Sequence, residues 1–409
     1  MDKRLKLTIF AFFAFLFIFI LIIIISEYKN MNQLRLDYPA LSEDVYRMRK
    51  DGLTLWAIRL ILQFLIPILF LTSKLSYKIR FFVGNERSLF TTGLLYGVIF
   101  FTLMFLINLP LNYYGSFILR HKYGLSNQTF SRWIELSLKG LLVNKLSLSL
   151  FIFIPFYIIA RSPKTWWIQL SLMAIPLIIF MIFITPMYID PIFNKYNPLE
   201  DKELGGQIEK VLYKAGISDA NIYVVDKSKD TKTMNAYMTG IFQSKRIVFW
   251  DNTINNLEEG EVLSIAAHEI GHYVERHIWK SIVLGSFGTI ILMFLVYITS
   301  NWILDLSRGS FGIKNLSDIA ALPLLLLVLN FYSFLSLPIT NYVSRYMERE
   351  ADTYEIILTG DRESAVSAME KLYKESLGVP RPSNIYKIWY HSHPSLEERV
   401  DFYKNHPMD

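Results

Sequence analysis

Seven long apolar runs are the feature that most limits how this chain of 409 residues can fold. Each approaches or exceeds the roughly 20 residues with which a helix crosses the hydrocarbon core of a bilayer. Only 19% of the residues are charged, against about 25% in an ordinary soluble domain. The pattern therefore predicts an all-α, multi-pass membrane protein with about seven transmembrane helices. The runs are 7–25, 56–73, 89–109, 141–160, 166–188, 278–304 and 319–340.

The first run follows a basic start, as the apolar part of a signal peptide does. It is too long for a signal peptide, however, and no small-residue cleavage site follows Ile25. We therefore expect it to be a retained anchor.

Two polar regions, 190–277 and 341–409, interrupt or follow the apolar runs and predict a water-exposed domain built from two pieces. Helical spacing over 204–215 ends at Gly216, a typical helix C-cap. Runs 222–225 and 246–250 are typical of short strands, and 235–239 is a candidate third strand. We divide the chain into a membrane domain, 1–188, with five spans, and a second domain, 189–409. The second domain includes the spans 278–304 and 319–340 and the soluble segment 341–409.

The composition excludes several classes of function. With no cysteine, the chain cannot form disulfides, a thiol nucleophile, cysteine-ligated zinc or an iron–sulfur cluster. The net charge of +6 is explained by basic loops that flank membrane spans, so no nucleic-acid partner is expected. A slight excess of Lys and Arg places the polar domain on the cytoplasmic side of the membrane.

The sequence His268-Glu269-Ile270-Gly271-His272 is an H-E-x-x-H motif. On a helix, residues four apart differ by about 40° in direction, so both imidazoles can bind one metal ion with Glu269 beside them. The alternative is two ordinary polar histidines on a helix near the membrane. We favour the metal site because this is the main histidine cluster of a chain with only seven histidines.

A catalytic zinc ion usually has three protein ligands and one open position, so a third ligand is expected. Glu348 and Asp352 lie four apart on one helical face, and Glu350 points away from them. Glu348 could bind the metal while Asp352 orients an imidazole. The alternative is a solvated, charged helix with ion pairs along its surface. Spacing alone hardly distinguishes this interpretation from a metal ligand.

Topology favours Glu348 as the third ligand. Two predicted spans separate it from His272, and an even number of crossings returns the chain to the same side of the membrane. A third histidine six residues after His272 is absent, because Ile278 occupies that position. His277 lies on the opposite side of the helix from His268, so we expect it to be structural or to support a ligand.

Two further polar groups lie in the soluble pieces. Asn235-Ala236-Tyr237 precedes a predicted strand, and Tyr390-His391-Ser392-His393-Pro394 precedes a short helical segment that contains Arg399. From the residues alone, structural roles are favoured for both.

Taken together, these residues resemble the type I CAAX prenyl endopeptidases, which are integral-membrane zinc proteases of the gluzincin class. The resemblance covers nearly the whole chain and includes the order and spacing of the motifs. Related heat-shock membrane proteases share the zinc motif and the S-R-x-x-E pattern but have fewer spans and lack the signature at 124–129. The matching segments are Lys122–Thr129, Asp190–Phe193, Asn235–Tyr237, Lys245–Val248, His268–His277, Ser344–Asp352 and Ser392–Arg399.

The resemblance implies a role for each motif. The zinc ligands would be His268, His272 and Glu348, with Glu269 as the catalytic base. Asp352 would support a ligand, while His393 and Arg399 would line the active site, and a substrate peptide would lie along Asn235, Ala236 and Tyr237. The family fold implies a helical barrel around an intramembrane chamber, with a mainly α peptidase domain that carries a small β element. One departure is Gly124-Leu125-Ser126-Asn127, where the family often has Gly-Phe-Asn.

The sequence thus predicts a membrane zinc metalloendopeptidase with one zinc ion per chain. Its partners would be the lipid bilayer and a peptide or protein substrate, and the resemblance implies that this substrate could be prenylated. One alternative is a quality-control protease that cleaves damaged membrane proteins. Another is a transporter or scaffold with a structural zinc ion. The composition is typical of a bacterial protein, which implies the cell membrane, and the sequence predicts no oligomeric state.

Overall fold

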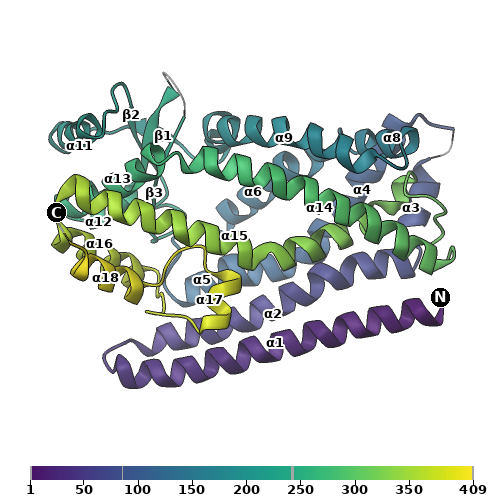
Figure 1. The fold of residues 1–409 in the computed structure, drawn as a ribbon, viewed down its shortest axis with the longest axis horizontal. Coiled ribbons are helices and arrows are strands. Elements are labelled where there is room, and N and C mark those ends of the chain that lie inside the picture. The colour runs from purple at the N-terminus through teal and green to yellow at the C-terminus, as the bar shows by residue number, and fades with distance from the viewer. Residues whose placement is uncertain (1, 85, 241–243, 408–409) are drawn as a thin grey trace.

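The computed structural model describes residues 2–84, 86–240 and 244–407 and is mainly helical. Seven helices or helical stacks are long and apolar enough to cross a membrane, as predicted. They run roughly side by side along the length of the molecule, and the polar domain lies at one end (Figure 1). The spans are Lys3–Asp37, Glu43–Thr72, Leu89–Lys122, Phe130–Arg161, Trp166–Phe193, His277–Ser307 and Ile319–Thr359.

The first two spans are single helices, and the next three are composite. A short helix, α3 (Leu75–Val83), follows the second span. The polar pair Asn144 and Lys145, which interrupts the fourth apolar run, lies in a π-helical turn. The elements are α1 (Lys3–Asp37), α2 (Glu43–Thr72), α4 (Leu89–Asn112), η1 (Tyr113–Ile118), α5 (Leu119–Lys122), α6 (Phe130–Leu141), η2 (Leu142–Leu146), α7 (Ser147–Ser149), α8 (Phe153–Arg161), α9 (Trp166–Ile184), η3 (Thr185–Ile189) and α10 (Asp190–Phe193).

The sixth span leaves the polar domain, and the seventh span returns to it. They are α14 (His277–Ser307) and η5 (Ile319–Ala321) followed by α15 (Leu322–Thr359). The apolar run predicts that the seventh span ends near residue 340, but α15 continues to Thr359 without a break. Hydropathy follows only the part of a helix that lipid surrounds, so it misses this extension. The same helix therefore crosses the membrane and carries Glu348 into the polar domain.

A small sheet forms one wall of the polar domain. Its strands are β1 (Tyr196–Pro198), β2 (Asn221–Val225), β3 (Ala236–Thr239) and β4 (Arg246–Trp250), in the order β1-β2-β4-β3. β2 pairs parallel with β4, and the other two pairs are antiparallel. β3 is thus an edge strand with one side unpaired in the sheet. The sequence did not predict β1, because a three-residue strand that contains a proline looks like a turn.

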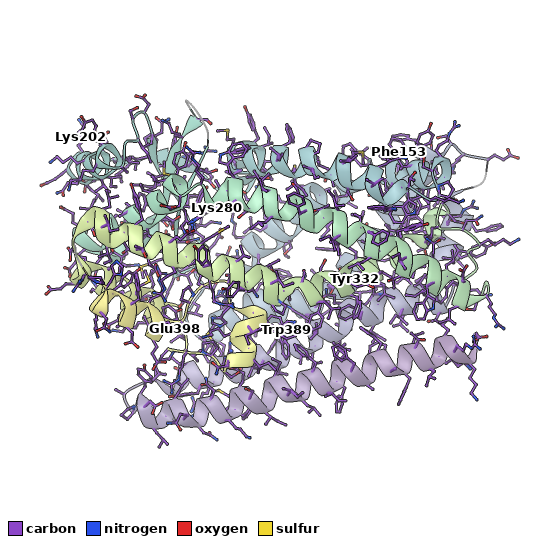
Figure 2. All side chains as sticks on the ribbon, in the orientation of Figure 1. Phe153, Lys202, Lys280, Tyr332, Trp389 and Glu398 are labelled. Carbon is purple, nitrogen blue, oxygen red and sulfur yellow. The ribbon has the colours of Figure 1, made fainter. Side chains whose placement is uncertain are left out.

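Helices complete the polar domain around one apolar core. These helices are α11 (Lys202–Lys214), α12 (Asp251–Asn256), α13 (Glu259–Val274), α16 (Arg362–Glu375) and α18 (Leu396–Asn405). A further helix, α17 (Asn384–Tyr390), packs instead against α1, α2 and α15. α13 packs closely on α15 at Gly271, where a Cβ atom would lie 3.2 Å from the Cα of Ala351. Figure 2 shows Lys202 and Glu398 at this polar end, while Phe153 lies toward the other end of the spans.

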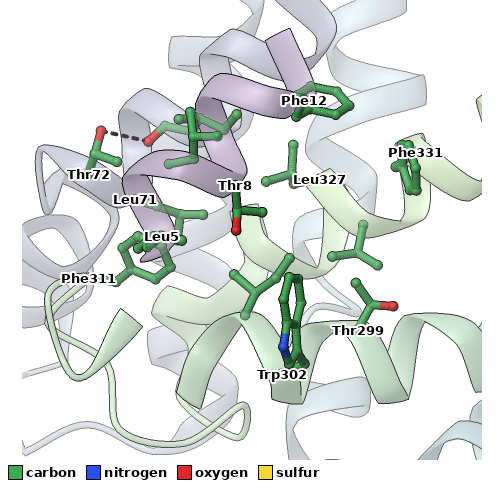
Figure 3. Close-up of a pocket in the computed structure, with 14 residues that line it drawn as sticks. Leu5, Thr8, Phe12, Leu71, Thr72, Thr299, Trp302, Phe311, Leu327 and Phe331 are labelled. Atoms are coloured by element: carbon green, nitrogen blue, oxygen red, sulfur yellow. Dashed lines mark hydrogen bonds between the residues drawn. The ribbon is translucent and has the colours of Figure 1, made fainter. Parts of the chain in front are cut away.

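The spans enclose hollow space. An apolar cavity of about 290 Å³ lies between α1, α2, α14 and α15, and Leu5, Phe12, Trp302 and Phe331 are among its walls (Figure 3). A second cavity, of about 320 Å³, lies between α2 and α15 and reaches Tyr390. The membrane helices thus form a chamber rather than a solid bundle.

Candidate metal centre

Two histidines on α13 face each other across one helical turn. The helix begins with a capping box, in which the side chains of Glu258 and Glu261 accept hydrogen bonds from each other's backbone N–H groups. One turn apart, the Nε2 atoms of His268 and His272 are separated by 3.1 Å. His268 is buried, whereas His272 is partly exposed. The helix period therefore directs both ring nitrogens to one point, as the motif predicts.

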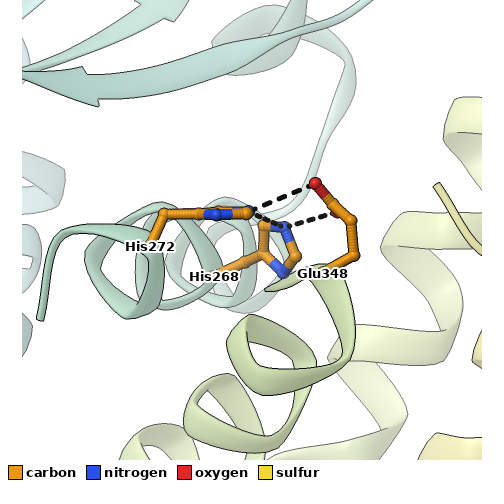
Figure 4. Close-up of side chains that lie close together, drawn as sticks. All are labelled: His268, His272 and Glu348. Carbon is orange, nitrogen blue, oxygen red and sulfur yellow. Dashed lines mark hydrogen bonds and ion pairs between the residues drawn. The ribbon is translucent and has the colours of Figure 1, made fainter. Parts of the chain in front are cut away.

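Glu348 reaches the same point from α15 (Figure 4). Its Oε2 lies 3.4 Å from Nε2 of His268, and its Oε1 lies 3.4 Å from Nε2 of His272. One potential ligand atom from each of the three residues lies within 4.8 Å of the others. Oε2 is buried and, among the described residues, accepts no hydrogen bond. A buried carboxylate oxygen that lacks a donor and faces two imidazole nitrogens fits a shared cation, and this donor set suits zinc with an open position.

A buried network holds the other side of the His268 ring. Nδ1 lies 3.1 Å from Oδ1 of Asp352, which also pairs with the guanidinium of Arg399. The hydroxyl oxygen of Tyr403 lies 2.9 Å from the same carboxylate oxygen. A carboxylate at this position fixes the orientation of an imidazole that binds a metal.

A cleft of about 380 Å³ opens beside the cluster. One wall is the approach to β3, with Asn235 and Ala236, and the facing wall includes His268, Glu269 and His393. Nε2 of His393 lies 3.3 Å from Oε1 of Glu348, and its Nδ1 lies 2.9 Å from the Ser392 hydroxyl. The cleft therefore brings together an edge strand, one of the three potential metal ligands, the Glu269 carboxyl and an imidazole that also contacts Glu348.

Comparisons with known proteins agree with this site. The model of peptidase family M48 matches residues 198–406, just over half of the chain, and the model of the CAAX prenyl protease N-terminal region, described as five membrane helices, matches residues 43–195. The chain belongs to peptidase family M48. It is an integral-membrane metallopeptidase, as the H-E-x-x-H motif and the apolar runs predict.

Several M48 relatives resemble most of the chain. An uncharacterized metalloprotease, YhfN, of Bacillus subtilis is 35% identical over 81% of this chain and 78% of its own. CAAX prenyl protease 1 of Saccharomyces cerevisiae is 30% identical over 72% of this chain and 68% of its own. The crystal structure of S. mikatae Ste24p matches with a TM-score of 0.77 and 24% identity over 88% of each chain. The family resemblance and the helical fold inferred from the sequence are thus confirmed.

Not every sequence-predicted residue of this M48 peptidase lies in the cleft. Tyr237 is on β3, but its hydroxyl lies 3.2 Å from that of Tyr196 instead of facing the cluster. Glu350, which helical spacing directs away from Glu348, pairs with His277 and Lys280 outside the cluster. Nδ1 of His277 lies 2.8 Å from Nδ1 of His272, so His277 supports that ring from behind.

The sequence did not single out Glu355, Ser264 or Tyr403, which complete the buried network. Glu355 accepts hydrogen bonds from the hydroxyls of Tyr403, over 2.7 Å, and Ser264. Its Oε2 lies 3.6 Å from Nδ1 of His268. Helical spacing is the signal that could have found two of them, because Glu355 lies one turn after Asp352 and Ser264 lies one turn before His268.

The cleft shifts the proton affinity of two of its groups. Burial raises the pKa of the Glu269 carboxyl above its ordinary value, although the neighbouring His268 and His272 oppose the shift. Desolvation lowers the pKa of His393, with Glu348 opposing it. A carboxylate with raised proton affinity is a suitable base, and a neutral imidazole can donate one N–H.

Proposed function

We propose that this membrane metallopeptidase binds one zinc ion through His268, His272 and Glu348 and cleaves peptide bonds of membrane-associated or C-terminally lipidated proteins. The observation that carries the proposal is the convergence of the three potential ligands on one point, with His268 also lining a cleft that contains Glu269 and His393. A structural zinc ion usually has four protein ligands, whereas three approach one point here among the described residues. This favours catalysis over the scaffold or transporter alternative.

The residues of the cleft divide the reaction between them. When bound, zinc supplies a Lewis acid that polarises the scissile carbonyl and activates water. Glu269 removes a proton from the attacking water and delivers it to the departing amine. His393 donates its Nε2–H to the oxygen on which negative charge develops. Asp352 holds His268 in position, and Arg399 balances the charge of Asp352.

The free edge of β3 is the expected binding surface for substrate. A peptide that adds to it as another strand gains main-chain hydrogen bonds without a demand for particular side chains. Asn235 and Ala236 already line the cleft at this edge, and Tyr237 contributes its backbone. We propose that the peptide runs antiparallel to β3, with its scissile bond opposite Glu269.

The substrate class is inferred from relatives. The relative in yeast is named CAAX prenyl protease 1, which favours a lipidated C-terminal peptide. A quality-control role, in which the same site cleaves damaged membrane proteins, is the second candidate. We also propose that residues 1–188 form the membrane domain, that 189–409 form the peptidase domain, and that the cleft opens to the cytoplasm.

Substrate capture tests the proposal. The Glu269→Gln variant should retain zinc and bind peptide but not cleave it, because its amide cannot act as the base. Expressed in the native membrane and purified with its bound peptides, it should retain lipidated C-terminal tails that the wild-type enzyme releases. Diverse internal fragments of membrane proteins would support the quality-control role instead. Full activity of the variant would reject the mechanism.

A further inference from the structure

His277 reaches the back of a proposed metal ligand because the helix before it is broken. On an unbroken helix, residues five apart differ by about 140° in direction, so His277 would point away from His272. Helix α13 ends at Val274, however, and Arg276 has a left-handed backbone, with a φ of 56°, before α14 begins at His277. This turn brings Nδ1 of His277 to 2.8 Å from Nδ1 of His272. A left-handed backbone is uncommon outside glycine, and such conformations gather at functional sites.

The other ring nitrogen of His277 contacts an acidic side chain of α15. Nε2 lies 3.0 Å from Oε2 of Glu350, and the same oxygen lies 2.9 Å from Nζ of Lys280, one turn along α14. The side chain of His277 is only 5% exposed and that of Glu350 is 26% exposed, so water is largely excluded from their contact. A hydrogen bond to a charged group is stronger where water is excluded. Lys280 thus balances the charge that Glu350 presents to His277.

With both rings neutral, one arrangement of protons satisfies these contacts when a cation is bound. A neutral imidazole carries one N–H, and a ring nitrogen that binds a metal carries none. Nε2 of His272 faces His268 and Glu348. The N–H of His272 is therefore at Nδ1 and donates to Nδ1 of His277. The N–H of His277 is then at Nε2 and donates to Glu350, so a carboxylate fixes the metal-binding nitrogen from two hydrogen bonds away.

Both histidines of the H-E-x-x-H motif are then supported by carboxylates of the same helix. Asp352 contacts Nδ1 of His268 directly. Glu350, two residues earlier on α15, reaches Nδ1 of His272 through the intervening imidazole. Side chains two residues apart on a helix differ by about 200°, so Glu350 points away from Glu348 and needs this ring to reach the site. Groups that hold a metal-binding histidine from behind typically change metal affinity by about 10–100-fold.

We propose that Glu350 is a positioning residue that acts through His277 to hold the His272 ring in the tautomer and orientation that bind zinc. This role rests on the proposed function and deepens it, because it makes zinc retention depend on two side chains that are not among the three ligands. It also couples the sixth span to the metal centre, because His277 is the first residue of α14.

A competition titration against a chelator of known affinity tests the proposal on the full-length protein. Glu350→Gln keeps an acceptor for the His277 N–H but removes its charge, so zinc affinity should fall about tenfold or more. Glu275→Gln is a matched control, because it removes a second carboxylate that lies 3.7 Å from Lys280 but leaves the contact of Glu350 in place. Its zinc affinity should equal that of the wild type. An unchanged affinity in Glu350→Gln, or an equal loss in Glu275→Gln, would overturn the proposal.

A cycle of single and double variants tests whether Glu350 acts through His277. The amide oxygen of His277→Asn lies near the former position of Nδ1 and can still accept from His272, but no atom remains at the position of Nε2 to contact Glu350. Adding Glu350→Gln to His277→Asn should therefore not weaken zinc binding further. If Glu350 acted independently of His277, the two losses would add, and that result would overturn the proposal.

Thermal unfolding with and without zinc separates this role from a purely structural one. Weaker zinc binding stabilises the fold less, so Glu350→Gln should lower the Tm of the zinc-loaded protein more than that of the zinc-free protein. Equal falls in Tm would show a structural role alone and would overturn the proposal. If the wild-type protein binds no zinc, the proposed function fails. If it binds zinc no more tightly than Glu350→Gln does, only the role of Glu350 fails.

Discussion

At the scale of single residues, the site depends on which groups contact the proposed metal ligands from behind. His268 is held by Asp352, and the hydroxyl oxygen of Tyr403 lies 2.9 Å from Oδ1 of Asp352 and 2.7 Å from Oε2 of Glu355, so the two carboxylates share its one proton. Arg399 brings a positive charge to the same buried space. Two buried carboxylates this close together are tolerable only because these donors surround them. The metal site is therefore as dependent on α18 as on the two helices that carry its ligands.

The Tyr403→Phe substitution should destabilise the protein without altering its shape. Removal of the hydroxyl takes away the one O–H that these two buried carboxylates share, at a cost of about 1–3 kcal/mol. Thermal unfolding should show a lower Tm for Tyr403→Phe. Tyr373→Phe is a matched control, because its hydroxyl contacts backbone groups, such as the carbonyl of Pro394 at 3.4 Å, and neither of these carboxylates. Equal Tm values for Tyr403→Phe and the wild type would contradict the network.

His391 should make the stability of the segment near the cleft depend on pH. Burial, followed by the nearby Arg49, lowers the pKa of His391 from 6.5 to about 4. Below pH 6.5 the unfolded chain takes up a proton that the folded chain does not bind until about pH 4. The contribution of neutral His391 to the stability of the fold is therefore complete above pH 6.5 and is lost as the pH falls toward 4.

The measurement is thermal unfolding at a series of pH values. Zinc is first removed by a chelator, so that its release does not contribute to the pH dependence of Tm. His391→Gln cannot titrate, so its Tm should fall less than that of the wild type between pH 7 and pH 5. Parallel curves for the two proteins would show that His391 does not carry this effect.

At the scale of elements, the first span is more than an anchor. The carboxylate of Glu27 on α1 is completely buried, accepts a hydrogen bond from the Ser383 N–H over 2.7 Å and pairs with Arg49 of α2. Asn30 donates to the carbonyl of Arg381 over 2.9 Å. These contacts hold the start of α17, which leads to His393. The two family models begin at residues 43 and 198, so α1 lies outside both.

A pair of double variants isolates the contact between Glu27 and Ser383. Glu27→Gln with Arg49→Met removes both charges but keeps a carbonyl oxygen for the Ser383 N–H, whereas Glu27→Leu with Arg49→Met removes that acceptor too. The second protein should lose about 1–3 kcal/mol more stability than the first, because it leaves a buried N–H unpaired. Limited proteolysis near residues 381–393 should be faster in the second protein. Equal cleavage rates would show that α1 does not hold this segment.

Local patterns predicted the elements better than they predicted the contacts between them. The H-E-x-x-H helix, the seven spans and strand β4 follow from spacing and hydropathy within short windows. Glu27 and Tyr403 were not singled out, because their importance depends on neighbours far away in the sequence. Glu348 was predicted because it lies four residues before Asp352 on one helical face. The two spans between His272 and Glu348 also return the chain to the same side of the membrane. A side chain whose partner lies far along the chain leaves no such pattern.

At the scale of the whole molecule, the membrane helices both bring the metal ligands together and surround the space beside them. α14 leaves the polar domain just after His272, and α15 returns across the membrane to deliver Glu348. The same two helices, with α1 and α2, enclose the apolar cavity at the far end of the chamber. Apolar walls at one end and the edge strand at the other suit a substrate that has both a lipid-soluble part and a peptide.

Zinc content measured together with peptide cleavage tests the central claim most directly. The purified wild-type protein should contain one zinc ion per chain and cleave peptide, and a chelator should abolish cleavage until zinc is restored. Glu269→Gln should keep its zinc ion but lose activity, whereas Glu348→Ala should lose both, because a buried ligand is removed. Cleavage by Glu269→Gln, or a full zinc content in Glu348→Ala, would contradict the account.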